Sequence, residues 1–467
     1  MKKYRKFCIL FLFMLSGCAV YHPLPLDRKA EEAVLKGPDT EALEIEASRI
    51  KHPLLKPVEF DLKDGLSPDE AAILAVVANP ELRAVRDEKK IASAQLLQAG
   101  LLPNPQLALS YEVPTAGVTS GTVNAYSLQL DWEITALLTR GARVSSARAE
   151  RAAVDLNVAW KEWQVAEAAK LHALRLLWAE RKVALLREAE RELKKNLALV
   201  ERAVSLGEKT ALDLAAARAT YQKIRLDLET AREERARERL TLNRVLGFPP
   251  NTYLKIQKDV RLLSWPPPIK REKLLSGLAE RRLDLLALKM SYQAQDERLR
   301  AAVLSQFPKI GIGLIRAKDT GDVITTGLAV SIELPFFDRG QAHIALEEAT
   351  RKKLYDEYLA RLFSARAEVA EILEKMAFVR RKIVASEEAV AALERLLVTY
   401  KEALHQGNAD LLGYYRLQNE LLLKRLELLR LRQTQSDLGV ALEIASGVYL
   451  PMRCKTLGIV NPKGDMK

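Results

Sequence analysis

The feature that most constrains this chain is a two-faced β-strand pattern that occurs twice, about 200 residues apart. In residues 122–134 the even positions from Tyr126 to Ile134 are apolar, whereas the odd positions from Ser127 to Glu133 are polar. Residues 324–334 repeat this alternation in the same phase. A period of two residues predicts a strand with one dry face and one wet face. Something outside these few strands must therefore cover the dry faces.

The strands lie between long charged helical stretches, and the whole arrangement is duplicated. Each half reads as a helix, a β-hairpin, a long helix and a second helix. The landmarks that flank these segments recur in the same order: Pro105 with Pro308, Arg140-Gly141 with Arg339-Gly340, Gly207 with Gly407, and Gly247 with Gly447. The sequence therefore predicts two copies of one structural unit.

Long stretches with little proline or glycine predict the helices. The first half is expected to contain helices from Ser67 to about Gly100, from Gly141 to Leu206 and from Thr210 to Leu246, with a break at Asn79-Pro80 left open. The second half is expected to contain helices from Arg271 to Ser305, from near Arg339-Gly340 to Gln406, and from there to Ser446.

The N-terminus reads as a targeting segment. A basic start precedes a short apolar stretch from Phe7 to Leu15, which is too short to span a bilayer. The sequence Leu15-Ser16-Gly17-Cys18 resembles a bacterial lipoprotein signal, in which Cys18 becomes the first mature residue and carries lipid. The alternative is an ordinary cleaved signal with an incidental cysteine. With Cys18 lipidated, Cys454 has no partner, and no disulfide framework is expected.

These patterns predict six segments along the chain. They are a lipoprotein signal peptide (1–17), an extended, lipid-anchored N-terminal tether (18–66), a first repeat (67–247, with its hairpin at 105–134), a connector (248–271), a second repeat (272–450, with its hairpin at 308–335) and a C-terminal tail (451–467).

Two hairpins supply only four strands, and four strands cannot close a sheet on itself. In hydrocarbon an open sheet edge leaves unpaired backbone groups, at several kcal/mol each. Single-chain bacterial barrels have at least eight strands, so closure between copies is expected, and a trimer gives twelve strands. The dry side chains would then face lipid or the barrel rim, among them Leu128, Leu130, Trp132, Leu328 and Val330. The alternative is a small water-soluble sheet packed on the helices.

The helices need neighbours along their whole length, because a long helix is not stable alone in water. Gly207 and Gly407 lie where one helix ends and the next begins, as a left-handed cap requires. The sequence therefore predicts antiparallel coiled-coil pairs that turn at these two glycines.

Composition and motifs exclude several function classes. The formal charge of +12 comes from Lys and Arg interleaved with Glu and Asp, which favours solvated helix faces over a nucleic-acid site. None of the five histidines has the spacing of a zinc site. The sequence contains no glycine-rich phosphate loop, nucleophile elbow or catalytic carboxylate pair. We therefore expect no enzyme activity, no cofactor and no bound metal.

The residues resemble the TolC family of outer-membrane efflux proteins across nearly all of 67–450. The resemblance rests on the duplication, the proline-flanked hairpins and short motifs at corresponding places: Arg140-Gly141-Ala142-Arg143-Val144, Phe337-Asp338-Arg339-Gly340-Gln341 and Gly207-x5-Asp213. The phrases around Trp132–Glu150 and Leu334–Ala349 are similar to the branch that exports cations.

The resemblance implies a mainly α fold with a membrane β-barrel. A homotrimer would form a twelve-stranded barrel in outer-membrane lipid and a long α-helical barrel in the periplasm. It also implies partners, namely a periplasmic adaptor (membrane fusion) protein and an inner-membrane pump of the RND type. The expected localisation is the cell outer membrane, lipid-anchored, with a large periplasmic part.

In this family, acids after the helix-turn glycine face a periplasmic constriction. Asp213 matches that position, whereas the second half has Gly413 there, which departs from the paired-acid pattern. The residues expected to close the duct are Asp213, Asp410, Tyr414, Tyr415 and Arg416. The alternative is that the acids only cap helices, with Thr210-x-x-Asp213 as a capping box and the tyrosines packed between helices.

The function expected is a passive exit duct of a tripartite efflux system, whose energy comes from the pump. Such a duct selects little, so the sequence leaves its cargo open between drugs, metal ions and proteins. The alternatives are a structural coiled-coil lipoprotein of the periplasm and the exit duct of a type I protein secretion system.

Overall fold

A computed structural model describes residues 20–57, 65–258 and 270–449. The chain divides into two units, 1–38 and 39–467. In the first unit, helix α2 (Arg28–Leu35) begins at Asp27, whose side chain accepts a hydrogen bond from the Ala30 N–H at 2.9 Å. The predicted signal peptide, the lipidation residue Cys18 and the predicted tail 451–467 lie outside the described residues.

The predicted extended tether (18–66) was wrong in its local structure, because it contains α2 and a second short helix, α3 (Thr40–Ser48). Helix α3 packs against α4 (Pro68–Ala78). Leu43 and Ala47 lie four residues apart and are both buried in the core shared with α4. One buried face is enough to hold a short helix that proline-rich composition alone disfavours.

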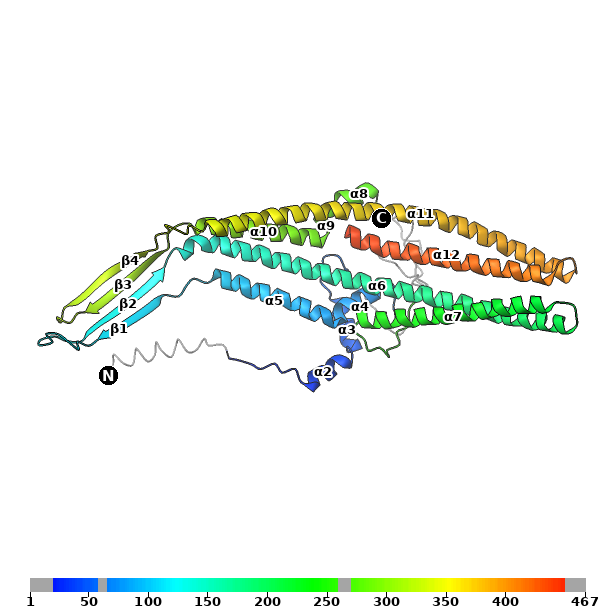
Figure 1. Ribbon diagram of the computed structural model, residues 1–467, viewed down its shortest axis with the longest axis horizontal. Helices are drawn as coiled ribbons and strands as arrows, with labels where there is room; N and C mark the ends of the chain where they lie inside the picture. The colour runs from blue at the N-terminus through cyan, green and yellow to red at the C-terminus, as the bar shows by residue number, and fades with distance from the viewer. Residues whose placement is uncertain (1–19, 58–64, 259–269, 450–467) are drawn as a thin grey trace, which may run out of the picture. The chain divides into compact units, whose positions relative to one another are not determined.

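The four strands form one antiparallel sheet in the order β1-β2-β3-β4 (Figure 1). They are β1 (Gln106–Glu112), β2 (Ala125–Glu133), β3 (Ile310–Lys318) and β4 (Ile324–Ile332). Strand β1 has 7 residues and the others have 9. Strands β2 and β3 pair with each other, which joins the two halves of the duplication and leaves β1 and β4 as edges.

The strand register places the dry side chains of all four strands on one side of the sheet, called here the apolar face. Residues that are directly opposite in neighbouring strands share a face, and Leu128 lies opposite both Leu109 and Arg316. The face consists of Leu107, Leu109, Tyr111, Tyr126, Leu128, Leu130, Trp132, Ile310, Ile312, Leu314, Arg316, Lys318, Ile324, Thr326, Leu328, Val330 and Ile332. The alternate residues form the polar face.

Each strand continues into a helix, so four helices follow the order of the sheet (Figure 1). They are α5 (Pro80–Gly100), α6 (Ala136–Ser205), α10 (Leu283–Leu304) and α11 (Gln341–His405). Helix α6 begins before the predicted Gly141, and its 70 residues span about 105 Å. Among the described residues, no helix is long and apolar enough to cross a membrane.

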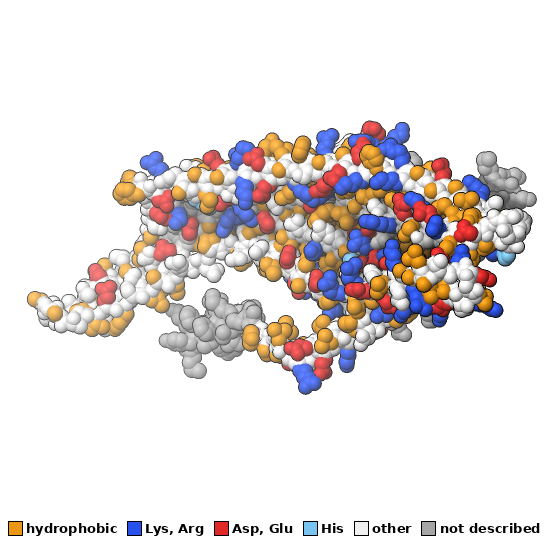
Figure 2. All heavy atoms as spheres, turned by 45° about the vertical axis from the view of Figure 1, so that its right-hand side comes forward, with side chains coloured by type: hydrophobic (Ala, Val, Ile, Leu, Met, Phe, Trp, Pro, Cys, Tyr) orange, Lys and Arg blue, Asp and Glu red, His pale blue; other side chains and the backbone are white. Residues whose placement is uncertain are grey.

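Two further helices return along the second half of the long ones. Helix α7 (Ala211–Val245) packs against α6, and α12 (Leu411–Ser446) packs against both α11 and α6. The buried residues form three separate clusters along this layer. Figure 2 shows basic and acidic side chains mixed over the helices, with no large area of one sign on the face in view.

The predicted continuous helix from Arg271 to Ser305 was wrong. The segment breaks into α8 (Arg271–Ser276), α9 (Leu278–Arg281) and α10. Arg282 is extended, with φ −73° and ψ 117°, and it is 1% exposed. Its guanidinium donates to Asp284, Glu368 and the Ala445 carbonyl. These contacts with α11 and α12 fix the break, and the local sequence does not reveal them.

Candidate functional site

The two helix turns have the same backbone geometry. At the end of α6, Gly207 has φ 75° and the Glu208 N–H donates to the Ala203 carbonyl at 2.8 Å. At the end of α11, Gly407 has φ 76° and the Asn408 N–H donates to the Ala403 carbonyl at 2.8 Å. This six-to-one bond with a left-handed glycine satisfies helix-end carbonyls.

The helices that follow begin with different side-chain caps. In the first half Thr210 and Asp213 form a complete capping box, in which the Thr210 N–H donates to Asp213 Oδ2 at 2.9 Å and Asp213 N–H donates to Thr210 Oγ1 at 3.2 Å. In the second half Asp410 alone is the cap, and it accepts from the Gly413 N–H at 2.9 Å. Asp213 and Asp410, the two acids predicted as gate residues, therefore each accept a hydrogen bond that caps the start of their own helix.

Gly413 has a role in the second turn that the sequence did not reveal. Tyr400 Oη, on α11, donates to Asp410 Oδ2 at 3.2 Å and passes directly over Gly413. A Cβ atom at position 413 would collide with Tyr400 Oη and would lie 2.8 Å from Asp410 Oδ2. The departure from the family's acid at this position therefore makes room for a tyrosine from the preceding helix.

Three of the five predicted gate residues line one cavity. Asp213, Tyr415 and Arg416 lie around a hollow of about 200 Å³ between α6, α7 and α12. Asp410 and Tyr414 are not part of its lining. Within the described part of the chain Arg416 forms no ion pair, although its charge reaches Asp213. Among the described residues, the bond from Tyr400 on α11 to Asp410 at the start of α12 is the one polar contact that these charged groups make with a neighbouring helix.

At this end of the helices, the surroundings favour the charged form of Asp213 and Asp410 and the neutral form of Tyr415. The backbone and side-chain hydrogen bonds of Thr210 lower the pKa of Asp213, helped by the charges of Lys209 and Arg416. The Gly413 N–H is the main cause that lowers the pKa of Asp410. Burial raises the pKa of Tyr415 to about 12, and its hydroxyl has no hydrogen-bond partner within the described residues.

Two consecutive side-chain hydrogen bonds also connect α6 with α12 at this end. Asn196 Nδ2, on α6, donates to Gln418 Oε1 on α12 at 2.8 Å, and Gln418 Nε2 donates to Tyr414 Oη at 3.1 Å. Sequence reasoning missed Asn196 and Gln418, because neither belongs to a motif and their proximity depends on how α6 and α12 pack. They tie the two helical hairpins together beside the cavity.

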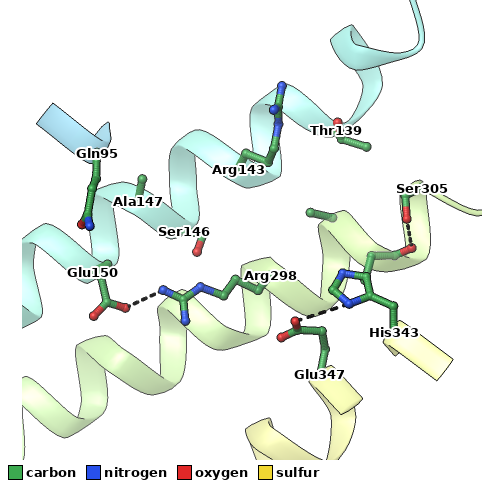
Figure 3. A pocket seen from close by; sticks show the side chains of 12 residues that line it. Gln95, Thr139, Arg143, Ser146, Ala147, Glu150, Arg298, Ser305, His343 and Glu347 are labelled. Atoms are coloured by element: carbon green, nitrogen blue, oxygen red, sulfur yellow. Dashed lines mark hydrogen bonds and ion pairs between the residues drawn. The ribbon is translucent and has the colours of Figure 1, made fainter. Parts of the chain in front are cut away.

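A second cavity, of about 520 Å³, lies at the other end of the helices, between α5, α6, α10 and α11 (Figure 3). Its walls carry side chains of both signs, and some of them lie close to one another. Arg298 Nη2 lies 3.0 Å from Glu150 Oε2, and His343 Nδ1 lies 3.7 Å from Glu347 Oε1. The cavity is therefore a polar, nearly balanced recess in the helical wall.

A buried ionic cluster fixes the middle of the helical layer. Lys170 Nζ, on α6, lies 2.8 Å from Glu443 Oε1 on α12 and 3.0 Å from Asp69 Oδ1 on α4. Lys170, Glu443 and the neighbouring Glu167 are all 0% exposed. The Lys170 ammonium also lies 4.9 Å from the ring centroid of Tyr449. No sequence motif indicates this cluster, since its members are spread over nearly the whole chain.

The cluster contains more carboxyl groups than cations, and burial makes that excess costly. Burial, followed by the charge of Glu443, raises the pKa of Glu167 well above its usual range. Burial also raises the pKa of Glu443 to about 7. Burial would lower the pKa of Lys170, but the surrounding carboxylates outweigh it and raise that pKa. A neutral Glu167 beside the Lys170–Glu443 ion pair is the consistent state.

The predicted sheet residues all lie on the apolar face. Leu128, Leu130, Leu328 and Val330 are exposed there, with Leu328 at 80%, and Trp132 is half-buried. The indole of Trp132 donates to the Pro103 carbonyl at 2.9 Å. A contiguous exposed apolar face marks an interaction surface.

In the described ranges of the chain, no three His, Cys, Asp or Glu side chains lie close enough to hold a metal ion.

Comparison with known proteins gives one family and one curated relative. Residues 274–448 match the family described as outer membrane efflux protein. The cobalt-zinc-cadmium resistance protein CzcC of Cupriavidus metallidurans is 24% identical over 305 residues, which cover 64% of this chain and 70% of the relative. The family match falls within the segment predicted as the second repeat (272–450), and the predicted resemblance to outer-membrane efflux proteins is confirmed.

Solved structures of outer-membrane proteins share the fold. CusC is similar with a TM-score of 0.68 and 18% identity, covering 88% of this chain and 99% of that one. The outer-membrane channel OprN has a TM-score of 0.70 and 14% identity, covering 92% and 98%. VceC of Vibrio cholerae has a TM-score of 0.67 and 20% identity, covering 82% and 96%.

Proposed function

We infer that this chain, whose residues 274–448 match the family described as outer membrane efflux protein, is a passive exit duct of a tripartite efflux system. The observation that carries the proposal is the four-stranded sheet, which has two open edges and exposes one continuous apolar face. Such a sheet is costly in water because of its apolar area and costly in lipid because of its edges. Association with further copies in a membrane removes both costs.

Three copies would close the sheet. Strand β1 of one copy would pair with β4 of the next, since these are the edge strands. The trimer would form a twelve-stranded barrel with Leu128 and Leu328 among the side chains against lipid. The polar face would line the lumen, with the Ser331 hydroxyl over Gly311 and the Asp131 carboxylate over Gly313. Helices α5, α6, α10 and α11 would continue this wall as a helical barrel in the periplasm.

The two helix turns would form the periplasmic entrance. We propose that this end docks with a periplasmic adaptor protein and receives cargo from an inner-membrane RND-type pump. Asp213, Tyr415 and Arg416 would contribute to the closed state through contacts between copies, which is consistent with the lack of an ion pair to Arg416 among the described residues. Lipidation at Cys18 would anchor the predicted tether 18–66 in the outer membrane.

The cargo proposed is small molecules or metal ions. CzcC is named for resistance to cobalt, zinc and cadmium, and its similarity favours a divalent metal cation. The polar face supports this choice through its charged residues, which are Glu112, Asp131 and Glu133. A lumen with acidic residues attracts cations and repels anions.

Cross-linking in membranes tests the trimer. Cysteines would replace Ala108 on β1 and Ala329 on β4, two small residues of the polar face on the open edges. A short bis-maleimide should join the double variant into covalent dimers and trimers in outer-membrane vesicles. Each single variant should give no such cross-linked species. A structural coiled-coil lipoprotein would give monomers for all three variants and would be extracted without detergent.

A further inference from the structure

Charge is divided between the two faces of the sheet. The charged residues of the apolar face are Arg316 and Lys318, both cationic. Those of the polar face are Glu112, Asp131 and Glu133, all acidic. Alternation alone would scatter charges over the wet side, so two cations on the dry side require an explanation.

Both cations lie at one end of the apolar face, next to the turns that connect the strands. Strand β3 begins with Ile310, Ile312 and Leu314 on this face and ends with Arg316 and Lys318. The turn to β4 follows at once, and the helices lie at the opposite end. Along β3 the apolar face therefore carries an apolar band followed by cations. This is the order expected of a strand that passes from the hydrocarbon core of a membrane into its headgroup layer.

Aromatic and hydroxyl groups accompany the cations. Lys318 lies opposite Tyr126, which in turn lies opposite Tyr111, and Arg316 lies opposite Thr326. Tyrosine is favoured at the level of lipid headgroups because one end of its ring is apolar and the other polar. The loop end of the face thus has the composition of a membrane interface.

Arg316 is exposed and forms no ion pair with any described residue. Lys318 is paired with Asp322 in the adjacent turn. An unpaired guanidinium beside hydrocarbon is costly unless an anion neutralises it. Its planar fork matches a phosphate group, and Lys318, about 7 Å away along the strand, can supply a second positive charge.

We propose that Arg316 and Lys318 form a binding site for the phosphate groups of anionic lipid in the outer leaflet. The proposal rests on the proposed function, which places the apolar face against lipid and the connecting turns outside. The site would hold each copy at a fixed depth in the membrane, with the acyl chains of the bound lipid along Leu314 and Leu328, which are paired in the sheet.

Native mass spectrometry of the full-length protein in detergent tests the site, with diphosphoryl lipid A as the probe and phosphatidylcholine as the neutral lipid. A cation at an anionic lipid surface contributes about fivefold to affinity. The double variant Arg316→Gln with Lys318→Gln should therefore bind lipid A about 25-fold more weakly, with phosphatidylcholine binding unchanged. The conservative exchange Arg316→Lys with Lys318→Arg should retain most of the affinity.

Lys309 provides the matched control, because it precedes the same strand at the helix end and pairs with Glu333 at 2.9 Å. Lys309→Gln should leave lipid A affinity unchanged. Equal affinity of the double variant and the wild type would overturn the proposal, as would an equal loss in Lys309→Gln. A wild-type protein that fails to insert and conduct in phosphatidylcholine bilayers would instead refute the duct. Conduction with unaltered lipid A affinity in the double variant would refute only the lipid site.

Discussion

Asn243 and Glu443 occupy corresponding places in the two halves, four residues before Gly247 and Gly447, yet they contact different partners. Asn243 stays local, since its Nδ2 donates to the carbonyls of the loop after α7, with Thr252 nearest at 2.8 Å. Glu443 instead reaches Lys170 of the other half at 2.8 Å.

The comparison shows that duplication preserved the backbone more closely than the side-chain chemistry. The helix breaks illustrate both tendencies. Asn79 Nδ2 donates to the Val245 carbonyl at 2.8 Å, and Arg282 Nη1 donates to the Ala445 carbonyl at 3.2 Å. The accepting carbonyl is equivalent in the two halves, while an amide has been exchanged for a guanidinium. At these two positions the second half has the charged residues Arg282 and Glu443 where the first half has Asn79 and Asn243.

Removal of the Lys170 charge should produce the largest effect. Lys170→Met leaves Glu443 and Asp69 buried without their cation, which should lower the free energy of unfolding by about 3–5 kcal/mol. Asn243→Ala, at the first-half position that corresponds to Glu443, loses only local hydrogen bonds and should cost about 1–3 kcal/mol. Thermal unfolding of both variants measures the difference. Equal losses would remove the distinction drawn between the halves.

The apolar face should respond equally in both halves. Leu128→Arg and Leu328→Arg each place a charge against lipid in the proposed trimer, which should cost about 2–4 kcal/mol at the bilayer midplane. Gln129→Arg and Ser331→Arg, on the polar face, should be tolerated. Urea titration of the protein folded into lipid vesicles gives the four values. Comparable damage on both faces would contradict the assigned strand phase.

The helix turns should also respond alike. Gly207→Ala and Gly407→Ala force an L-residue into left-handed backbone, at about 1–2 kcal/mol each. A Cβ atom at either position meets nothing within 4 Å, so strain is the whole cost. Gly413→Ala should disturb only the second turn, because its Cβ displaces Tyr400. Spectroscopic melting of the three variants checks this, and unequal costs at positions 207 and 407 would break the equivalence.

Acid should destabilise the two helix turns by similar amounts, which should be smaller than the effects of the substitutions above. The pKa of Asp213 is lowered mainly by the Thr210 N–H, and that of Asp410 by the Gly413 N–H. Each cap is therefore fully effective above the ordinary Asp pKa of about 3.9 and is lost as pH falls through its lowered value. Pepsin cleavage near residues 207 and 407 between pH 4 and pH 2 should rise together. Cleavage at one turn alone would show unequal caps.

The sequence predicted those features that depend on local pattern. The alternation around Leu128 and Leu328 determined which residues share a face, and Gly207 and Gly407 marked the turns. Capping by Thr210 and Asp213 was also readable, because its spacing is fixed by helix geometry. Features set by packing were not readable. Lys170 and Glu443 are 273 residues apart, and no period connects them. Arg282 breaks a helix only because α11 and α12 offer it partners.

Conductance across planar bilayers tests the duct most directly. The purified protein should insert from one side and give discrete channels that are small at rest, because the helix turns of the copies would meet in the proposed closed state. Arg416→Ala should raise the conductance, and its effect should be non-additive with Asp213→Ala if the two groups are partners between copies. Unchanged conductance with additive losses of stability would leave Asp213 as a cap alone. A protein that gives no channels and remains a monomer without detergent would contradict the account.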